Sequence, residues 1–270
     1  MLSDITIGQF FPGKSIVHRI DPRAKILLVL AFIIVLFIVR NPVSFLLIAV
    51  FLIGAYIIAK IPANAIWRGV KPILPLIAFT SILNLFFVDG EPLVHWWIFK
   101  ITAEGISVAV LMAIRIVCLI IGSLLLTYTT SPIALTDAIE RLLKPLKVIR
   151  FPVHEMAMMM TIALRFIPTL LEETDKIMSA QKARGADLET GSIVKRAKAL
   201  IPILIPLFVS AFRRAEDLAL AMECRCYRGG EGRTRMKQLY FSRLDAAAAS
   251  VTGVLFAAAI LLDIFLPKFI

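Results

Sequence analysis

Long runs of apolar residues alternate with short polar segments along most of this chain. An α-helix needs about 20 consecutive apolar residues to cross a bilayer, and several runs approach that length. They lie at about residues 26–39, 43–59, 73–88, 106–128 and 246–265. Residues 89–100, between the third and fourth runs, are expected to form a loop. The pattern predicts an all-α, polytopic membrane protein with about five transmembrane helices.

The pattern changes between the last two apolar runs, where residues 131–243 are rich in charge. Ser131-Pro132 can cap and begin a short helix. Two longer helical patterns follow, at about residues 153–188 and 192–227. Each carries an apolar stretch before a charged end, as in a helix that starts against a membrane and ends in water. The predicted organisation is a membrane region with four spans (1–130), a charged region of about three helices (131–243), and a C-terminal transmembrane helix (244–270).

The chain carries 30 Lys and Arg against 19 Asp and Glu, a formal net charge of +11. In a soluble protein this balance would suggest a nucleic-acid ligand. However, 59% of the residues are hydrophobic, and Lys and Arg collect on the cytoplasmic loops of membrane proteins. The segment before the first span and the loop after the second are basic. We therefore expect a multi-pass cell-membrane protein without a nucleic-acid partner. Its N-terminus and residues 131–243 would be cytoplasmic, and its C-terminus extracytoplasmic.

Two short motifs share one design near the ends of the two long helical patterns. They are Ala183-Arg184-Gly185 and Cys224-Arg225-Cys226. Small flanking residues let a partner surface come close, and a guanidinium offers a rigid fork of donors to a carboxylate. Either arginine alone could be an ordinary surface residue. Together they predict a chain that contacts a partner, or two partners, at two similar sites.

The apolar parts of the same two helical patterns are too short to span a membrane and too apolar to face water. They could pack against each other, bind an apolar partner, or do both. The first is rich in methionine, whose flexible side chain adapts to varied surfaces. The candidate docking residues are Met156, Met159, Met160, Leu164, Ile203 and Phe208.

Clusters able to perform chemistry are scarce in this sequence. Cys224-x-Cys226 lacks a second cysteine pair or nearby histidines, which disfavours a zinc site. His154-Glu155 lacks the second histidine of a zinc-protease motif, because position 158 is Met158. The Gly-x-x-x-x-Gly-Lys-Ser/Thr pattern of a nucleotide site is also absent. We expect no catalytic residue, metal or cofactor on this chain, which argues against a membrane enzyme. A secondary transporter usually shows an internal repeat, and none is found.

Arg115 stands midway along the fourth apolar run. A charge inside a membrane segment is a functional candidate by default. It could instead pair with Glu104 or bridge to polar backbone groups near the inner side of the membrane, and the sequence leaves these alternatives open.

Several segments together resemble the transmembrane T component of energy-coupling factor (ECF) transporters, the EcfT/CbiQ family of vitamin and metal-ion importers of the ABC class. The resemblance covers essentially the whole chain. The segments are 15–25 (SIVHRIDPRAK), 130–132 (TSP), 151–155 (FPVHE), 163–170 (ALRFIPTL), 181–185 (QKARG) and 221–230 (AMECRCYRGG).

The resemblance implies a scaffold that transmits force rather than an enzyme. In that family, two such arginine motifs cap two long crossed helices and dock into grooves on two cytoplasmic ATPase subunits, which are identical or different. The apolar faces of the same helices hold a separate substrate-binding membrane subunit, the S component. ATP and Mg²⁺ are bound by the ATPases.

This chain departs from the family pattern at the second motif, where Cys224 and Cys226 stand in place of Ala and Gly. Cysteine is only slightly larger than alanine, so docking should survive. A residue with a Cβ disfavours left-handed backbone, so Cys226 leaves open whether a glycine-type turn forms there.

Overall fold

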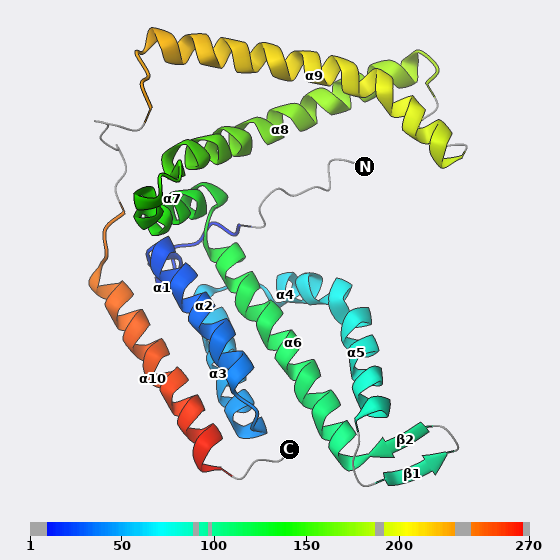
Figure 1. Cartoon of the computed structure of the whole chain (residues 1–270), viewed down its shortest axis with the longest axis vertical. Helices are drawn as coiled ribbons and strands as arrows, with labels where there is room; N and C mark the ends of the chain where they lie inside the picture. Colours follow the sequence, from blue (N-terminus) through cyan, green and yellow to red (C-terminus); the bar gives the residue numbers. More distant parts are fainter. Residues whose placement is uncertain (1–9, 89–91, 97–98, 187–191, 230–238, 267–270) are drawn as a thin grey trace. The chain divides into compact units, whose positions relative to one another are not determined.

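The computed structural model describes residues 10–88, 92–96, 99–186, 192–229 and 239–266. The chain forms two compact units (Figure 1). The membrane unit comprises Gly8–Leu135 and Lys237–Ile270. The helix-pair unit contains Thr136–Met236, together with Met1–Ile7.

Helices dominate the membrane unit, as the apolar pattern predicts. They are α1 (Ile16–Arg19), α2 (Pro22–Ile38), α3 (Pro42–Ala59), α4 (Ala63–Val70), the 3-10 turn η1 (Lys71–Ile73), α5 (Leu74–Phe87), α6 (Ala103–Thr129) and α10 (Arg243–Phe265). Among the described residues, four helices are long and apolar enough to cross a membrane: α3, the continuous stretch Ala63–Phe87, α6 and α10. The 17 residues of α2 lie at the short end of the roughly 17–25 that can span. The all-α, polytopic fold is confirmed.

Local sequence sets the starts of the first two long helices. The side chains of Asp21 and Asn41 cap α2 and α3 by accepting the backbone N–H groups of Arg23 and Val43. A proline follows each cap, where its fixed φ suits the first helical turn and its missing N–H costs nothing. These two Asx-Pro pairs define where the chain enters the two helices.

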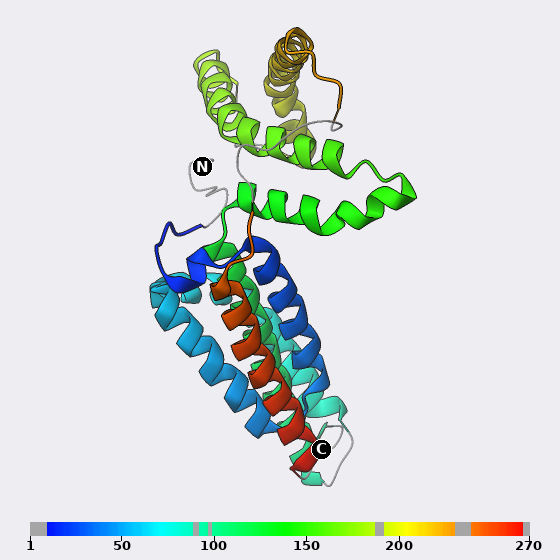
Figure 2. The same cartoon turned by 90° about the vertical axis from the view of Figure 1, so that its left-hand side faces the viewer.

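The core of the membrane unit lies between α2, α3, α6 and α10. Leu36, Phe45 and Phe256 are among its buried residues. Figure 2 shows α10 lying against α2 and α3, although α10 comes last in the sequence. The Ser44 hydroxyl donates to the Ala259 carbonyl at 2.9 Å, which fixes α3 against α10.

Arg115 has a structural partner. Its Nη2 donates to the carbonyl of Val39, the residue that caps the end of α2, at 2.7 Å. Its guanidinium also lies 5.4 Å from the centre of the Phe45 ring. At the same turn, the backbone N–H groups of Arg40 and Asn41 both donate to Asp263 Oδ1 at 2.7 Å. Of the alternatives left open by the sequence, donation to the backbone is observed, but its acceptor lies at the end of α2 farther from the basic N-terminal segment rather than near the inner side.

The loop expected at residues 89–100 is in part wrong. Strand β1 (Pro92–Trp96) pairs antiparallel with β2 (Phe99–Thr102), with His95 opposite Lys100 and Trp96 opposite Phe99. Valine, isoleucine, threonine and aromatic residues are concentrated here, and these residue types favour strands. The segment between these two spans therefore contains a pair of antiparallel strands.

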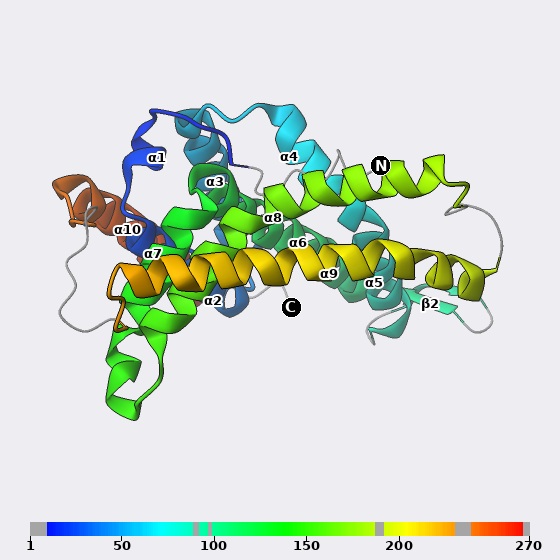
Figure 3. The same ribbon diagram turned by 90° about the horizontal axis from the view of Figure 1, so that it is seen from above.

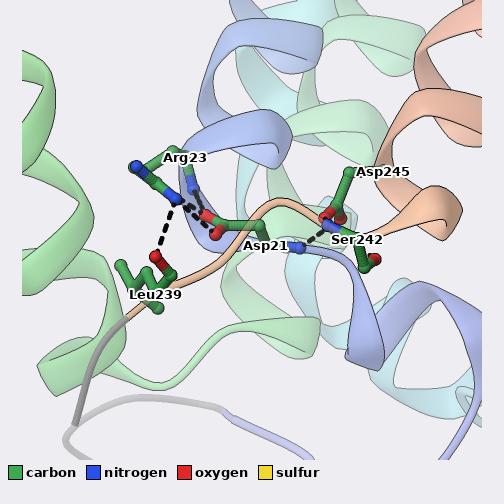
Figure 4. Close-up of polar contacts among 5 residues, drawn as sticks. All are labelled: Asp21, Arg23, Leu239, Ser242 and Asp245. Atoms are coloured by element: carbon green, nitrogen blue, oxygen red, sulfur yellow. Dashed lines mark hydrogen bonds and ion pairs between the residues drawn. The ribbon is translucent and has the colours of Figure 1, made fainter.

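A cluster of polar groups ties the start of α2 to the start of α10 (Figure 4). The Asp21 N–H donates to Asp245 Oδ1 at 2.6 Å, and the Ser242 N–H donates to Asp245 Oδ2 at 2.6 Å. Asp245 is buried and also completes a capping box with Ser242. Arg23 pairs with Asp21 at 2.9 Å, donates to the Leu239 carbonyl at 3.2 Å, and covers the Phe241 ring at 4.1 Å. Hydrogen bonds to charged groups contribute about 1.5–3 kcal/mol each, so this cluster fixes where α10 begins.

The helix-pair unit is built from two long helices, α8 (Val153–Ala183) and α9 (Ile193–Cys224). They are preceded by α7 (Pro132–Leu143) and the 3-10 turn η2 (Lys144–Ile149). Both long helices run through internal prolines without ending. They contact one another, run in roughly opposite directions and cross, as expected for the two long helices (Figures 1 and 3). The expected end of the first long helix at residue 188 lies outside the described residues, and α8 ends at Ala183.

Candidate functional site: two arginine tips on a helix pair

The first arginine motif forms a hydrogen-bonded helix end. The N–H of Ala186 donates to the carbonyl of Gln181 at 3.0 Å, and the N–H of Gly185 donates to that of Lys182 at 3.0 Å. Gly185 has φ +85°. These two bonds and the left-handed residue define a Schellman motif, in which Arg184 is the cap residue of α8.

The second motif has the same structure. The N–H of Tyr227 donates to the carbonyl of Met222 at 3.0 Å, and the N–H of Cys226 donates to that of Glu223 at 2.8 Å. Cys226 has φ +54°, so the turn left open by the sequence does form, with cysteine in the position of glycine. Left-handed backbone costs an L-residue roughly 1–2 kcal/mol, and the two hydrogen bonds offset this cost.

The two arginines are therefore presented in matching ways. Arg184 has φ −84° and ψ 5°, and Arg225 has φ −91° and ψ 12°. Both side chains are exposed. Within the part of the chain that the structure describes, neither guanidinium has a hydrogen-bond or ion-pair partner. We call these residues, with their flanking Ala183, Gly185, Cys224 and Cys226, the arginine tips.

An ion pair joins the two helices at equal distances from the tips. Arg214 Nη2 on α9 lies 3.0 Å from Glu173 Oε2 on α8. Glu173 lies eleven residues before Arg184, and Arg214 lies eleven residues before Arg225. At a rise of 1.5 Å per residue, each tip is about 16 Å along its own helix from this pair.

Because α8 and α9 are antiparallel, the tips lie in opposite directions from the Glu173–Arg214 pair, about 30 Å apart. The position of Gly229, just beyond the second tip, agrees with this arrangement. A Cβ placed on Gly229 would lie 3.9 Å from Glu155 Oε1, at the beginning of α8. The first tip is at the other end of α8. A single small groove could not receive both arginines.

Two further contacts support the helix pair. A hydrogen bond from Ser210 and then the Arg214 guanidinium hold the pKa of the Glu173 carboxyl below its ordinary value. Gln181 Nε2 lies 3.5 Å from the carbonyl of Pro202, whose usual donor four residues on is absent because position 206 is proline. The internal prolines of α9 thus leave a backbone acceptor that α8 uses.

Apolar side chains remain exposed along α9. Ile201, Leu204, Ile205, Phe208 and Phe212 are all between 45% and 70% exposed. Their spacing follows one face of a helix. We call these five residues the α9 apolar stripe. An exposed apolar row of this length marks an interaction surface more often than a solvated one.

The candidate docking residues from the sequence divide by burial. Phe208 belongs to the stripe, and Met159 and Met160 on α8 are exposed at 57% and 39%. Met156 and Leu164 are partly buried. Ile203 is only 3% exposed, so its side chain is buried in this structure, and its part in docking stays a prediction. The sequence offered no direct sign of which side of α9 is covered, because residues 201–212 are apolar almost throughout.

The cysteines carry no disulfide. Cys118 is buried, and Cys224 and Cys226 are exposed free thiols. Among the residues that the structure describes, no group of three or more His, Cys, Asp or Glu could hold a metal ion. His154 Nδ1 lies 3.1 Å from Glu140 Oε1.

The left-handed turn at Cys226 gives a sharp test of the second tip. Cys226→Val should open the turn, because β-branched residues are rarely tolerated at positive φ. An additional strain of about 1–2 kcal/mol, beyond that already carried by Cys226, corresponds to roughly 5- to 30-fold faster amide hydrogen exchange at residues 222–227. Cys226→Gly should slow exchange. Cys224→Val is the matched control, since Cys224 is still helical. Equal exchange in Cys226→Val and wild type would contradict the strain argument.

Comparison with known proteins gives a consistent result. The model of the CbiQ family, described as cobalt transport protein, matches residues 13–236. A relative from Ruminiclostridium cellulolyticum strain H10 is 54% identical over 263 residues, covering 97% of this chain and 98% of its own. Relatives from Acidaminococcus fermentans and Bacillus subtilis strain 168 are 54% and 43% identical, each covering at least 95% of both chains. All three bear the name energy-coupling factor transporter transmembrane protein EcfT. This chain belongs to the EcfT/CbiQ family, the transmembrane components of energy-coupling factor transporters.

Proposed function

We propose that this chain is the non-catalytic scaffold that couples ATP hydrolysis on two cytoplasmic ATPase subunits to movement of a separate substrate-binding membrane subunit. The substrate would be a vitamin or a metal ion and would be bound by that subunit. ATP and Mg²⁺ would be bound by the ATPases, so this chain needs no cofactor. The N-terminus and the helix-pair unit would be cytoplasmic and the C-terminus extracytoplasmic, in keeping with the basic loops.

The matched geometry of the arginine tips is the observation that carries this proposal. Two Schellman ends present exposed arginines with nearly the same backbone angles. They point from opposite ends of an antiparallel helix pair, about 30 Å apart by helix rise. Two equivalent partners, each offering a groove with an acidic group, fit this arrangement better than one partner does. A guanidinium suits such a groove because it binds carboxylates with two parallel hydrogen bonds.

Coupling requires that the ATPases contact the tips differently in their open and closed states. When the two grooves move relative to one another, the ends of α8 and α9 must follow. The Glu173–Arg214 pair and the Gln181–Pro202 contact hold the two helices together between the tips. The α9 apolar stripe and the exposed methionines of α8 would then change position as the tips move. A partner with an apolar membrane surface, docked on them, would be reoriented.

The native thiols of the second tip supply the test. A membrane-impermeant maleimide should modify Cys224 and Cys226 rapidly in the chain purified alone, because both thiols are exposed. In the assembled complex, bound ATPases should slow this modification several-fold, and their removal should restore it. Cys118 is buried and should stay unmodified throughout. In sealed vesicles, the reagent should reach the tip only from the cytoplasmic side.

The first tip is tested in the same way after a cysteine is introduced there and the two native cysteines of the second tip are replaced. Ala183→Cys, in a background with Cys224→Ala and Cys226→Ser, should also be protected by the ATPases. Val148→Cys in that background is the matched control, because Val148 is 89% exposed and lies in η2, outside the residues of both tips. Protection of Val148→Cys to the same extent, or no protection at either tip, would contradict the proposed docking.

A further inference from the structure

The membrane unit contains an apolar cavity of about 470 Å³ between α2, α3, α6 and α10. This volume falls within the roughly 300–1,000 Å³ of small-molecule sites. The cavity is partly open to its surroundings. It exists because small residues stand where the helices face one another: Gly54 and Ala55 on α3, and Ala247 and Ala248 on α10.

The cavity lies near one end of the helices. Its lining comes from α1 and Ile20, from the first two thirds of α2 and of α10, from the last half of α3 and from the last third of α6. Three aromatic rings close its inner end. The Phe32 and Phe256 rings are 6.2 Å apart, and the Phe51 and Phe256 rings are 6.3 Å apart. Its other end is near the chain's basic loops, which is the end we assign to the cytoplasm.

The few polar groups that line the cavity already have partners. Lys25 Nζ donates to the Thr129 carbonyl at 2.9 Å and has further acceptors in Thr130 and His18. The Thr129 hydroxyl donates to the Leu125 carbonyl, and the Thr252 hydroxyl donates to that of Ala248, each at 2.7 Å. A buried water needs two to four polar partners. The cavity offers none that are free in its described lining, so its occupant should be apolar.

Exposed cations stand beside cavity-lining residues in the sequence, at the basic end. Arg19, Lys60 and Arg243 are all exposed. Arg19 and Arg243 immediately precede Ile20 and Leu244, which line the cavity, and Lys60 lies two residues after Ile58, which also lines it. The carboxylates nearest in sequence, Asp21 and Asp245, are buried and hydrogen-bonded. Three charges at one rim complement an anionic head group.

We infer that this cavity binds one acyl chain of an anionic phospholipid, with the phosphate at the rim formed by Arg19, Lys60 and Arg243. Three of the helices that line the cavity are long and apolar enough to span a bilayer. Lipid therefore surrounds these helices. An empty cavity forfeits dispersion contacts on all its walls. An acyl chain restores those contacts and needs no hydrogen bond. The basic rim favours a lipid with a net negative head group over phosphatidylcholine, whose choline cation neutralises its phosphate.

Two glycines allow a matched test. Both Gly54 and Gly253 have open space where a Cβ would be placed. Gly54 lines the cavity, whereas Gly253 on α10 does not. Gly54→Phe should therefore fill the cavity and Gly253→Phe should add the same side chain elsewhere in the membrane. Replacing glycine within a helix also improves helix propensity, and Gly54→Leu provides a smaller alternative if the phenylalanine disturbs folding.

The probe is phosphatidylglycerol carrying a photoreactive diazirine in its acyl chain, in nanodiscs that contain the assembled transporter. Peptides from α3 and α10 should be labelled in wild type and Gly253→Phe, and at least several-fold less in Gly54→Phe. The corresponding phosphatidylcholine should label wild type less than phosphatidylglycerol does. The double substitution Arg19→Gln, Arg243→Gln should remove that preference while leaving acyl labelling.

Two results would overturn the inference. One is equal labelling of these peptides in wild type, Gly54→Phe and Gly54→Leu. The other is labelling of the isolated chain that disappears on assembly, since this would assign the cavity to a protein partner. Equal labelling by the two lipids would refute the anionic preference. Because tip docking is measured separately by thiol protection, these outcomes do not depend on the proposed function.

Discussion

The double charge reversal Arg184→Glu, Arg225→Glu should detach the ATPases and abolish transport. Removing one partner of a buried or half-buried Arg–carboxylate pair costs about 3–5 kcal/mol, and placing a second carboxylate in the groove should cost at least as much. At 1.4 kcal/mol per factor of ten, each single reversal should weaken docking roughly 100-fold or more. The two costs should be nearly additive, because sites more than 7–10 Å apart without shared partners rarely couple.

The measurement is recovery of the ATPases with the purified chain, followed by uptake in reconstituted vesicles. Lys176→Glu and Arg213→Glu are matched controls, since both cations are exposed between the two tips and give the same change of charge outside them. The double control should retain the ATPases. Lysine at both tips should weaken docking less than glutamate, because it keeps the charge and loses the bidentate geometry. Full recovery of the complex with the tip double mutant would refute the docking role.

The sequence predicted the helices of this protein well because the relevant signals are local. Apolar runs, Asx-Pro starts and the change in charge at residue 131 all lie within short windows. The two arginine motifs could also be found directly, since each is only three residues long. Their common backbone structure could not be predicted. The conformational preference of a cysteine opposes left-handed backbone at position 226. The hydrogen bonds from Cys226 and Tyr227 to the last turn of α9 favour that conformation.

Contacts between distant residues explain what the sequence did not predict. Asp245 binds the N–H of Asp21, more than two hundred residues earlier, and neither residue is unusual in its local setting. Glu173 and Arg214 are two of many charges on their helices, and only the antiparallel pairing of α8 and α9 brings them within 3.0 Å. The equal spacing of this pair from both tips becomes visible only after the pairing is known.

The choice of docking residues illustrates the same limit on a single helix. Residues 201–212 are apolar on nearly every side, so periodicity cannot identify the exposed face. Ile203 and Phe208 were both predicted to dock, yet Ile203 is 3% exposed and Phe208 is 61% exposed. The structure therefore moves the candidate surface on α9 to the stripe, and on α8 to Met159 and Met160.

The paired substitution Ile205→Glu, Phe208→Glu should release the substrate-binding subunit and leave the ATPases bound. Both side chains lie in the α9 apolar stripe and are about 60% exposed, so neither change places a charge in the core of the helix pair. Burying a phenylalanine or isoleucine at an interface contributes about 1.5–3 kcal/mol, and a desolvated carboxylate adds a penalty. Binding of that subunit should fall at least 100-fold, and uptake should stop.

Leu220→Glu is the matched control for this last prediction. Leu220 is 57% exposed on the same helix but lies beyond the stripe, close to the charged tip. It should retain both partners. Recovery of each subunit with the purified chain separates the possible results. Loss of the ATPases together with the substrate-binding subunit would indicate that the helix pair had unfolded. A melting temperature equal to that of the wild type would exclude unfolding. Retention of both partners with normal uptake would place the docking surface away from α9.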